Sequence, residues 1–166
     1  MKGKTGQQQI SFGMIFSIIL VIVFLGFAFY AIKTFLAAGD KAKAVKFLDD
    51  LQEEVTNAWE NQASSETQEY ILPGYVDFVC FVDFGSRSRG ENSALFAELN
   101  RIGNNEENLG FYPVKYTGFE SATINHINLE ETTADENPLC IEARNGEVQI
   151  TLKKDFGEAL VTIEKP

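Results

Sequence analysis

The chain has 166 residues and a formal net charge of −10. Residues 40–166 are long enough for one hydrophobic core but too short for two. The arginines, Arg87, Arg89, Arg101 and Arg144, form no basic stripe on this acidic chain. Nucleic-acid binding needs clustered cations that displace counterions, so the composition argues against a nucleic-acid partner.

The first element in chain order is an apolar segment. From Ile10 to Ile32 the 23 residues carry no charge, and only two serines and two glycines interrupt the apolar side chains. As a helix this stretch spans roughly 34 Å, slightly more than the ~30 Å hydrocarbon core of a bilayer. Tyr30 and Lys33 stand where an interfacial aromatic residue and a snorkelling lysine belong. We predict a transmembrane helix over residues 7–36 and a single-pass membrane protein.

Two alternatives concern this segment. A cleaved secretory signal would use Ala37-Ala38-Gly39 as its cleavage site, but the apolar region of such a signal runs only ~7–15 residues. For the orientation, the lysines that follow the segment favour a cytoplasmic C-terminal domain. The paired cysteines and the leader favour the opposite side, and we expect an extracytoplasmic domain.

The residues before the apolar segment form a short basic leader. Residues 1–6 read Met-Lys-Gly-Lys-Thr-Gly, and Gly6 is followed by Gln7. This junction resembles the class III signal peptide of archaeal type IV pilin-like proteins. The resemblance implies processing between Gly6 and Gln7, followed by assembly into an extracellular filament. In the alternative, Lys2 and Lys4 are ordinary cytoplasmic flanks of a permanent anchor.

This sequence departs from the pilin pattern at one position, and it also resembles a second group of proteins. Bacterial pilins carry a glutamate near the start of the mature chain, where this sequence has the uncharged Ser11. The apolar segment, with Pro73 and Cys80-Phe81-Val82 further on, also resembles uncharacterised small archaeal single-pass membrane proteins. In a filament the apolar helix would form the core of a homo-oligomer. Gly13 and Ser17, a small-x-x-x-small pair, are candidates for close helix packing.

An amphipathic stalk helix is predicted over residues 40–64, with Asp40 as its N-cap. Its apolar residues Ala44, Leu48, Leu51, Val55 and Ala58 recur at spacings of four and three, with Phe47 and Trp59 alongside. The opposite face is polar and holds Lys43, Lys46, Asp50, Glu53, Glu54 and Asn57. This pattern predicts that one stripe packs on a sheet while the other faces water.

Residues 65–166 are predicted to form an acidic, antiparallel β-rich domain. The expected strands are Tyr75–Phe84, Phe111–Tyr116, Ala122–Leu129, Leu139–Ala143, Glu147–Lys153 and Ala159–Glu164, with a short helix over Asn92–Ile102. Asn145-Gly146 is a strong hairpin signal between two of these strands. The fold class is therefore α+β: a long N-terminal helix, with a transmembrane half and an amphipathic half, packed on an antiparallel sheet that ends in a C-terminal meander.

Cys80 and Cys140 are the only cysteines. An even pair in an exported domain favours a disulfide, and two buried thiols are the alternative. His126, the only histidine, is expected to be a polar residue on a strand, because no ligand pair has zinc-site spacing. The sequence also lacks a nucleophile elbow and a phosphate-binding glycine motif. We expect no catalytic activity, no metal or other cofactor and no small-molecule substrate.

The loop Gly85–Gly90 contains Arg87 and Arg89. Three interpretations stay open: a flexible surface loop, an anion site before a helix, or a contact with an acidic patch of a neighbouring subunit. For the whole chain two functions remain. One is a pilin-like filament subunit. The other is a permanently membrane-anchored envelope protein whose extracytoplasmic domain binds a partner.

Overall fold

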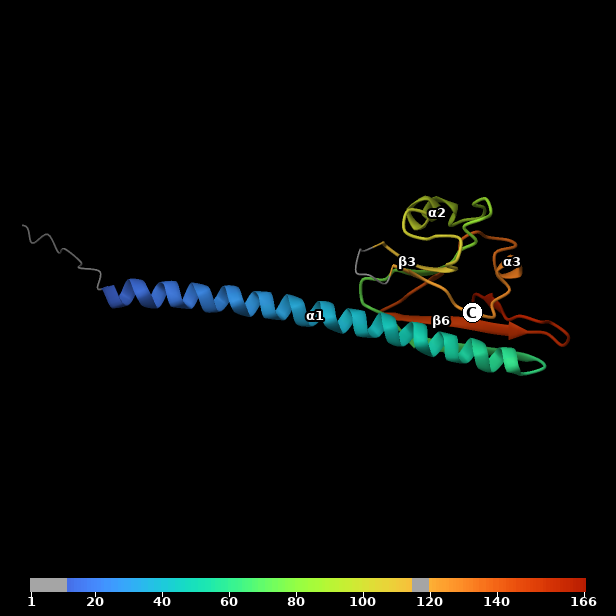
Figure 1. Ribbon diagram of the computed structural model, residues 1–166, viewed down its shortest axis with the longest axis horizontal. Coiled ribbons are helices and arrows are strands. Elements are labelled where there is room, and N and C mark those ends of the chain that lie inside the picture. Colours follow the sequence, from blue (N-terminus) through green and yellow to red (C-terminus); the bar gives the residue numbers. More distant parts are fainter. Residues whose placement is uncertain (1–11, 115–119) are drawn as a thin grey trace, which may run out of the picture. The chain divides into compact units, whose positions relative to one another are not determined.

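The computed structural model describes residues 12–114 and 120–166. The chain divides into two compact units, of which one ends at Ala38 and the other comprises Gly39–Pro166. Helix α1 (Phe12–Glu60) contributes to both and runs for 49 residues without a break (Figure 1). The predicted N-cap at Asp40 is therefore wrong, because this residue lies inside a continuous helix.

The second part of α1 buries most of the predicted stripe, and Phe47 in addition. Its buried residues are Ala44, Phe47, Leu51, Val55 and Ala58. Their spacing of three or four places them on one face of a helix, and this face packs on the core. Leu48 is only half-buried and Trp59 lies at the edge of the stripe, 37% exposed.

One sheet contains β1 (Ser64–Ile71), β6 (Glu147–Lys154) and β7 (Thr162–Glu164), in the order β1-β6-β7. All neighbours are antiparallel, and β1 pairs with β6 from Ser64 opposite Lys154 to Ile71 opposite Glu147. We did not predict β1, because its polar sequence has only one buried side chain, that of Tyr70. β1 is extended because it pairs with β6, and the propensities of its own residues do not indicate a strand.

A second sheet contains β2 (Phe78–Phe81), β3 (Leu109–Tyr112), β4 (Ser121–Ala122) and β5 (Leu139–Glu142), in the order β4-β3-β2-β5. All its pairs are antiparallel. Of the residues predicted as a strand over Tyr75–Phe84, only the four residues of β2 form one. Both of its faces are buried: Val79 and Phe81 belong to the main core, whereas Cys80 belongs to a smaller cluster with Val82.

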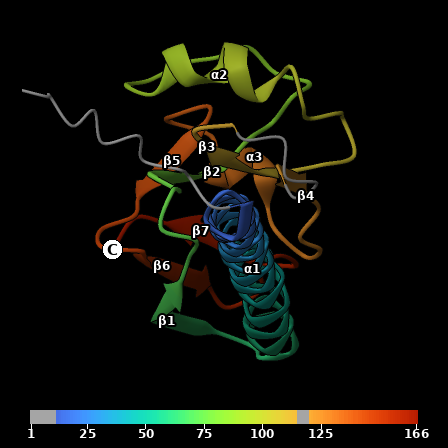
Figure 2. The same cartoon turned by 90° about the vertical axis from the view of Figure 1, so that its left-hand side faces the viewer.

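Helix α2 (Ser93–Leu99) covers the outer face of this second sheet (Figure 2). Leu99 is fully buried and packs in the same cluster as Cys80 and Cys140. The helix agrees with the one predicted over Asn92–Ile102. Gly110 in β3 allows this close approach, because a Cβ there would lie 2.9 Å from a methyl carbon of Leu99.

The predicted hairpin at Asn145-Gly146 is half right. Both residues have the positive φ that the turn needs, 56° and 78°. The strands on either side nevertheless belong to different sheets, since β5 pairs with β2 and β6 pairs with β1 and β7. Only a bridge between Arg144 and Glu147 closes the turn. The C-terminal meander is therefore limited to β6 and β7.

The strand predicted over Ala122–Leu129 is wrong beyond Ala122. The chain turns at His126, whose φ is 68°, and α3 (Leu129–Thr132) follows. The Asn128 side chain caps this short helix by accepting a hydrogen bond from the Glu131 backbone N–H. Of the strand predicted over Phe111–Tyr116, the first two residues belong to β3, and residues 115 and 116 lie outside the described residues. The overall class, α+β with a long helix packed on antiparallel sheets, is confirmed.

Candidate functional site

The most unusual surface of the chain is the first part of α1. Every described residue up to Gly39 is exposed, and the large apolar side chains range from 41% exposed at Leu20 to 84% at Phe12. A contiguous apolar surface of this size marks a contact with lipid or with protein. By its length and composition α1 is able to cross a membrane.

The Ser17 and Thr34 hydroxyl groups in this segment are satisfied within the helix. The Ser17 hydroxyl donates to the Gly13 carbonyl oxygen at 2.8 Å, and the Thr34 hydroxyl donates to the Tyr30 carbonyl oxygen at 3.0 Å. Both hydroxyls can therefore enter an apolar environment without losing a hydrogen bond. The Gly13 and Ser17 pair keeps a small side-chain profile on one face of the helix.

The predicted processing junction, Gly6 and Gln7, lies outside the described residues. Its interpretation rests on the sequence of the leader.

A buried lysine fastens the last turn of α1 to β6. The ammonium group of Lys154 donates to the carbonyl oxygen of Trp59 and, at 2.9 Å, to that of Asn61. Lys154 is only 8% exposed. The final carbonyls of a helix have no partner within the helix, so a cation at this point satisfies them and complements the helix dipole. We did not predict this contact. Lys154 nevertheless continues the alternation of the buried Val148, Ile150 and Leu152 and so lies on the same side of β6.

His126 also contacts the end of α1. Its ring stacks on the Trp59 indole, and it lies in a loop instead of on the predicted strand. The indole N–H donates to the Ala159 carbonyl oxygen at 3.0 Å. Gln52 holds the same loop, because its side-chain oxygen accepts from the Asn125 backbone N–H at 2.8 Å. These contacts give the histidine a packing role.

Cys80 and Cys140 form a disulfide that joins β2 to β5. The two residues are directly opposite each other in the strand register, and their Cα atoms are 4.0 Å apart. Both are buried beneath α2, at 0% and 3% exposure. The disulfide interpretation therefore applies, and the alternative of two free thiols does not.

The arginine loop is held by a buried asparagine. Asn137 is fully buried; its amide oxygen accepts from the Asp83 N–H, and its amide nitrogen donates to the carbonyl oxygens of Asp83 and Arg87. Arg89 exchanges two backbone hydrogen bonds with Asn137, and its guanidinium donates to the Thr133 carbonyl oxygen at 3.0 and 3.1 Å. Arg89 thus fixes the loop to the domain, and both Arg87 and Arg89 are exposed.

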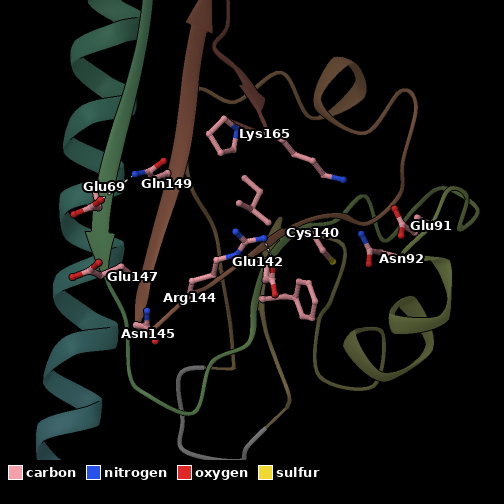
Figure 3. Close-up of a pocket in the computed structure, with 13 residues that line it drawn as sticks. Glu69, Glu91, Asn92, Cys140, Glu142, Arg144, Asn145, Glu147, Gln149 and Lys165 are labelled. Carbon is pink, nitrogen blue, oxygen red and sulfur yellow. Dashed lines mark hydrogen bonds and ion pairs between the residues drawn. The ribbon is translucent and has the colours of Figure 1, made fainter.

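A polar groove of about 800 Å³ lies between β5 and the outer face of β1 and β6 (Figure 3). Its charged lining residues are Glu69, Glu91, Glu142, Arg144, Glu147 and Lys165. Arg144 pairs with Glu142 at 2.8 Å, and Lys165 pairs with Glu136 at 2.9 Å. Neither a histidine nor a serine is among the described lining residues, and no described group of three His, Cys, Asp or Glu residues is placed to hold a metal ion.

No protein-family model, no curated protein and no solved structure matches this chain.

Proposed function

We propose that this protein is a pilin-like structural subunit. Its apolar N-terminal helix would first lie in a membrane and then form the core of an extracellular filament, with the domain Gly39–Pro166 on the filament surface. The observation that carries the proposal is the completely exposed apolar segment of α1, which continues into an amphipathic part that packs on a sheet.

The physical basis is that one apolar helix can serve in both environments. In a bilayer its side chains contact lipid, and in a filament the same side chains contact neighbouring helices. Helix Phe12–Glu60 satisfies its own backbone hydrogen bonds, so neither environment has to supply them. The Gly6-Gln7 junction supports the proposal, because its resemblance to a class III signal provides a step that releases the helix from its basic leader. The Cys80–Cys140 disulfide is consistent with an extracytoplasmic domain.

N-terminal sequencing and intact mass of the native protein test the proposal. We expect a mature chain that begins at Gln7, and filaments visible by electron microscopy in the sheared extracellular fraction. A Gly6→Arg variant should keep its leader and form no filaments. Gly3→Arg is the matched control, since it alters the other leader glycine, and it should be processed normally.

A permanently anchored protein gives the opposite result. Its native chain would begin at Met1 and remain in the membrane fraction after shearing. That outcome would replace the filament proposal with an envelope protein whose domain binds a partner.

A further inference from the structure

The polar face of α1 carries a regular row of side chains in the second unit. Lys43, Lys46, Asp50, Glu53 and Asn57 follow one another at spacings of three, four, three and four residues. Such residues lie above one another on a helix, so they form one continuous line, which we name the charged row. All five are exposed or half-buried, and they face away from the buried stripe of the helix.

The charges in this row are segregated. The cations occupy its N-terminal end and the anions its C-terminal end. Lys46 and Asp50 satisfy each other within the helix, since the ammonium nitrogen lies 2.6 and 2.9 Å from the two carboxylate oxygens. Lys43 and Glu53 have no hydrogen bond or ion pair with any described residue. Ten helical residues separate them, which corresponds to about 15 Å, so they cannot meet within one helix.

We propose that the charged row sets the axial offset between neighbouring copies of this chain. Two parallel helices shifted by about 15 Å place Lys43 of one copy beside Glu53 of the next. An unshifted pair would instead place Lys43 beside Lys43 and Glu53 beside Glu53, which like-charge repulsion disfavours. The inference rests on the proposed filament, in which neighbouring copies of the chain have the same orientation.

The Lys43–Glu53 pairs between copies select one axial offset and contribute little to the free energy of association. An exposed ion pair stabilises by roughly 0–1 kcal/mol, whereas burial of the apolar segment of α1 supplies the driving force. Along an assembly every neighbouring contact repeats the same pair. A small preference per contact is therefore sufficient to favour one offset over the unshifted arrangement.

Cysteine cross-linking in assembled full-length protein tests the offset. A Lys43→Cys/Glu53→Cys variant should give a ladder of disulfide-linked oligomers, because each copy can join two neighbours. The two new thiols are too far apart to join within one chain. The native cysteines are already paired with each other. Each single variant should give no disulfide-linked oligomers. Lys43→Cys/Glu60→Cys is the matched control for a wrong offset, and it should give no ladder.

A charge swap gives a second readout. Lys43→Glu and Glu53→Lys should each raise the protein concentration needed for assembly about five-fold to ten-fold. The combined swap should restore the wild-type value, since the opposite charges meet again between copies.

The outcomes separate the two proposals. Dimers in the Lys43→Cys single variant would indicate unshifted neighbours and overturn the offset. Failure of the combined swap to restore assembly would also overturn it, and would be expected if Lys43 served only anionic lipid head groups. Absence of any assembly of the wild-type chain by electron microscopy would instead overturn the proposed function.

Discussion

Trp59 and His126 lie face to face, with their ring centroids 4.0 Å apart and 13° between the ring planes. Trp59 lies in the last turn of α1 and His126 lies in the loop before α3, so their contact joins two segments distant in sequence. Because the Trp59 N–H also bonds Ala159, three parts of the domain meet at the end of α1.

Replacement of Trp59 by alanine should weaken this junction. The variant loses the ring stack and the hydrogen bond to Ala159, and we expect a fall of about 2–3 kcal/mol in the free energy of unfolding. Thermal unfolding of the full chain in detergent, followed by near-ultraviolet circular dichroism, measures the change. Trp59→Phe keeps an aromatic ring but lacks the N–H donor, so its free energy of unfolding should lie between those of the wild type and Trp59→Ala. Equal stability of all three proteins would contradict the role given to the stack.

The buried lysine at the end of α1 offers a sharper comparison. Lys154→Met should lower the free energy of unfolding by about 1–3 kcal/mol, because the carbonyl groups of Trp59 and Asn61 lose their donor in a buried site. Lys153→Met is the matched control, since this neighbouring lysine makes surface ion pairs with Asp155 and Glu164. If both variants are equally stable, the cap contributes nothing beyond surface electrostatics.

Tyr70 predicts a response at alkaline pH. Its buried hydroxyl finds no hydrogen-bond partner among the described residues. Burial raises the pKa of Tyr70 above its usual 10.0, and the nearby carboxylates of Glu54 and Asp50 add to the rise. The neutral form is thus favoured in the folded protein, while the unfolded chain ionises first. The contribution of Tyr70 to the free energy of unfolding is therefore fully present below pH 10. It is lost as the pH rises above 10.

Tyr70→Phe should remove this part of the alkaline loss. Near neutral pH the variant should be as stable as the wild type or slightly more stable, because no buried donor is left unpaired. Unfolding experiments at pH 7 and pH 11 measure the difference between the two proteins. Since other groups titrate in both, only that difference is informative. Parallel losses in both proteins would contradict the assignment to Tyr70.

The disulfide should contribute substantially to stability. It closes a loop with a sequence separation of 60 residues. Chain-entropy arguments give roughly 4 kcal/mol for a loop of this length. Cys80→Ala/Cys140→Ala should lose about this amount and should no longer respond to dithiothreitol, whereas the wild type should lose stability when reduced. A wild type whose unfolding is insensitive to complete reduction would contradict this prediction.

Sequence patterns predicted the helices better than the sheets. The buried stripe of α1 was predictable, because an apolar period of three to four residues is a property of the helix itself. Asn145 and Gly146 likewise indicated their turn, since positive φ is a local requirement. The same signal did not indicate that β5 and β6 pair with different neighbours. Strand partners depend on contacts between distant segments, and β1 illustrates this, because its polar sequence becomes a strand through β6.

The candidate sites follow the same division. The pairing of Cys80 and Cys140 could be predicted, because only two cysteines are available. Asn137 was missed, although it organises the arginine loop, because a single buried amide has no sequence period. Arg89 was predicted as a possible anion or partner contact. Its contact with the Thr133 carbonyl oxygen, 44 residues away in sequence, was missed, because no local pattern indicates it.

The position of the disulfide also affects how the domain would tolerate proteolytic damage. Between Cys80 and Cys140 the chain passes through α2, β3, β4 and α3 before it returns to β5. A peptide bond cut anywhere in that interval leaves the two fragments covalently joined. The second fragment also supplies β6, which pairs with β1 of the first fragment, and β7, which pairs with β6. A nicked molecule would therefore keep its mass on a non-reducing gel and separate into two pieces only after reduction.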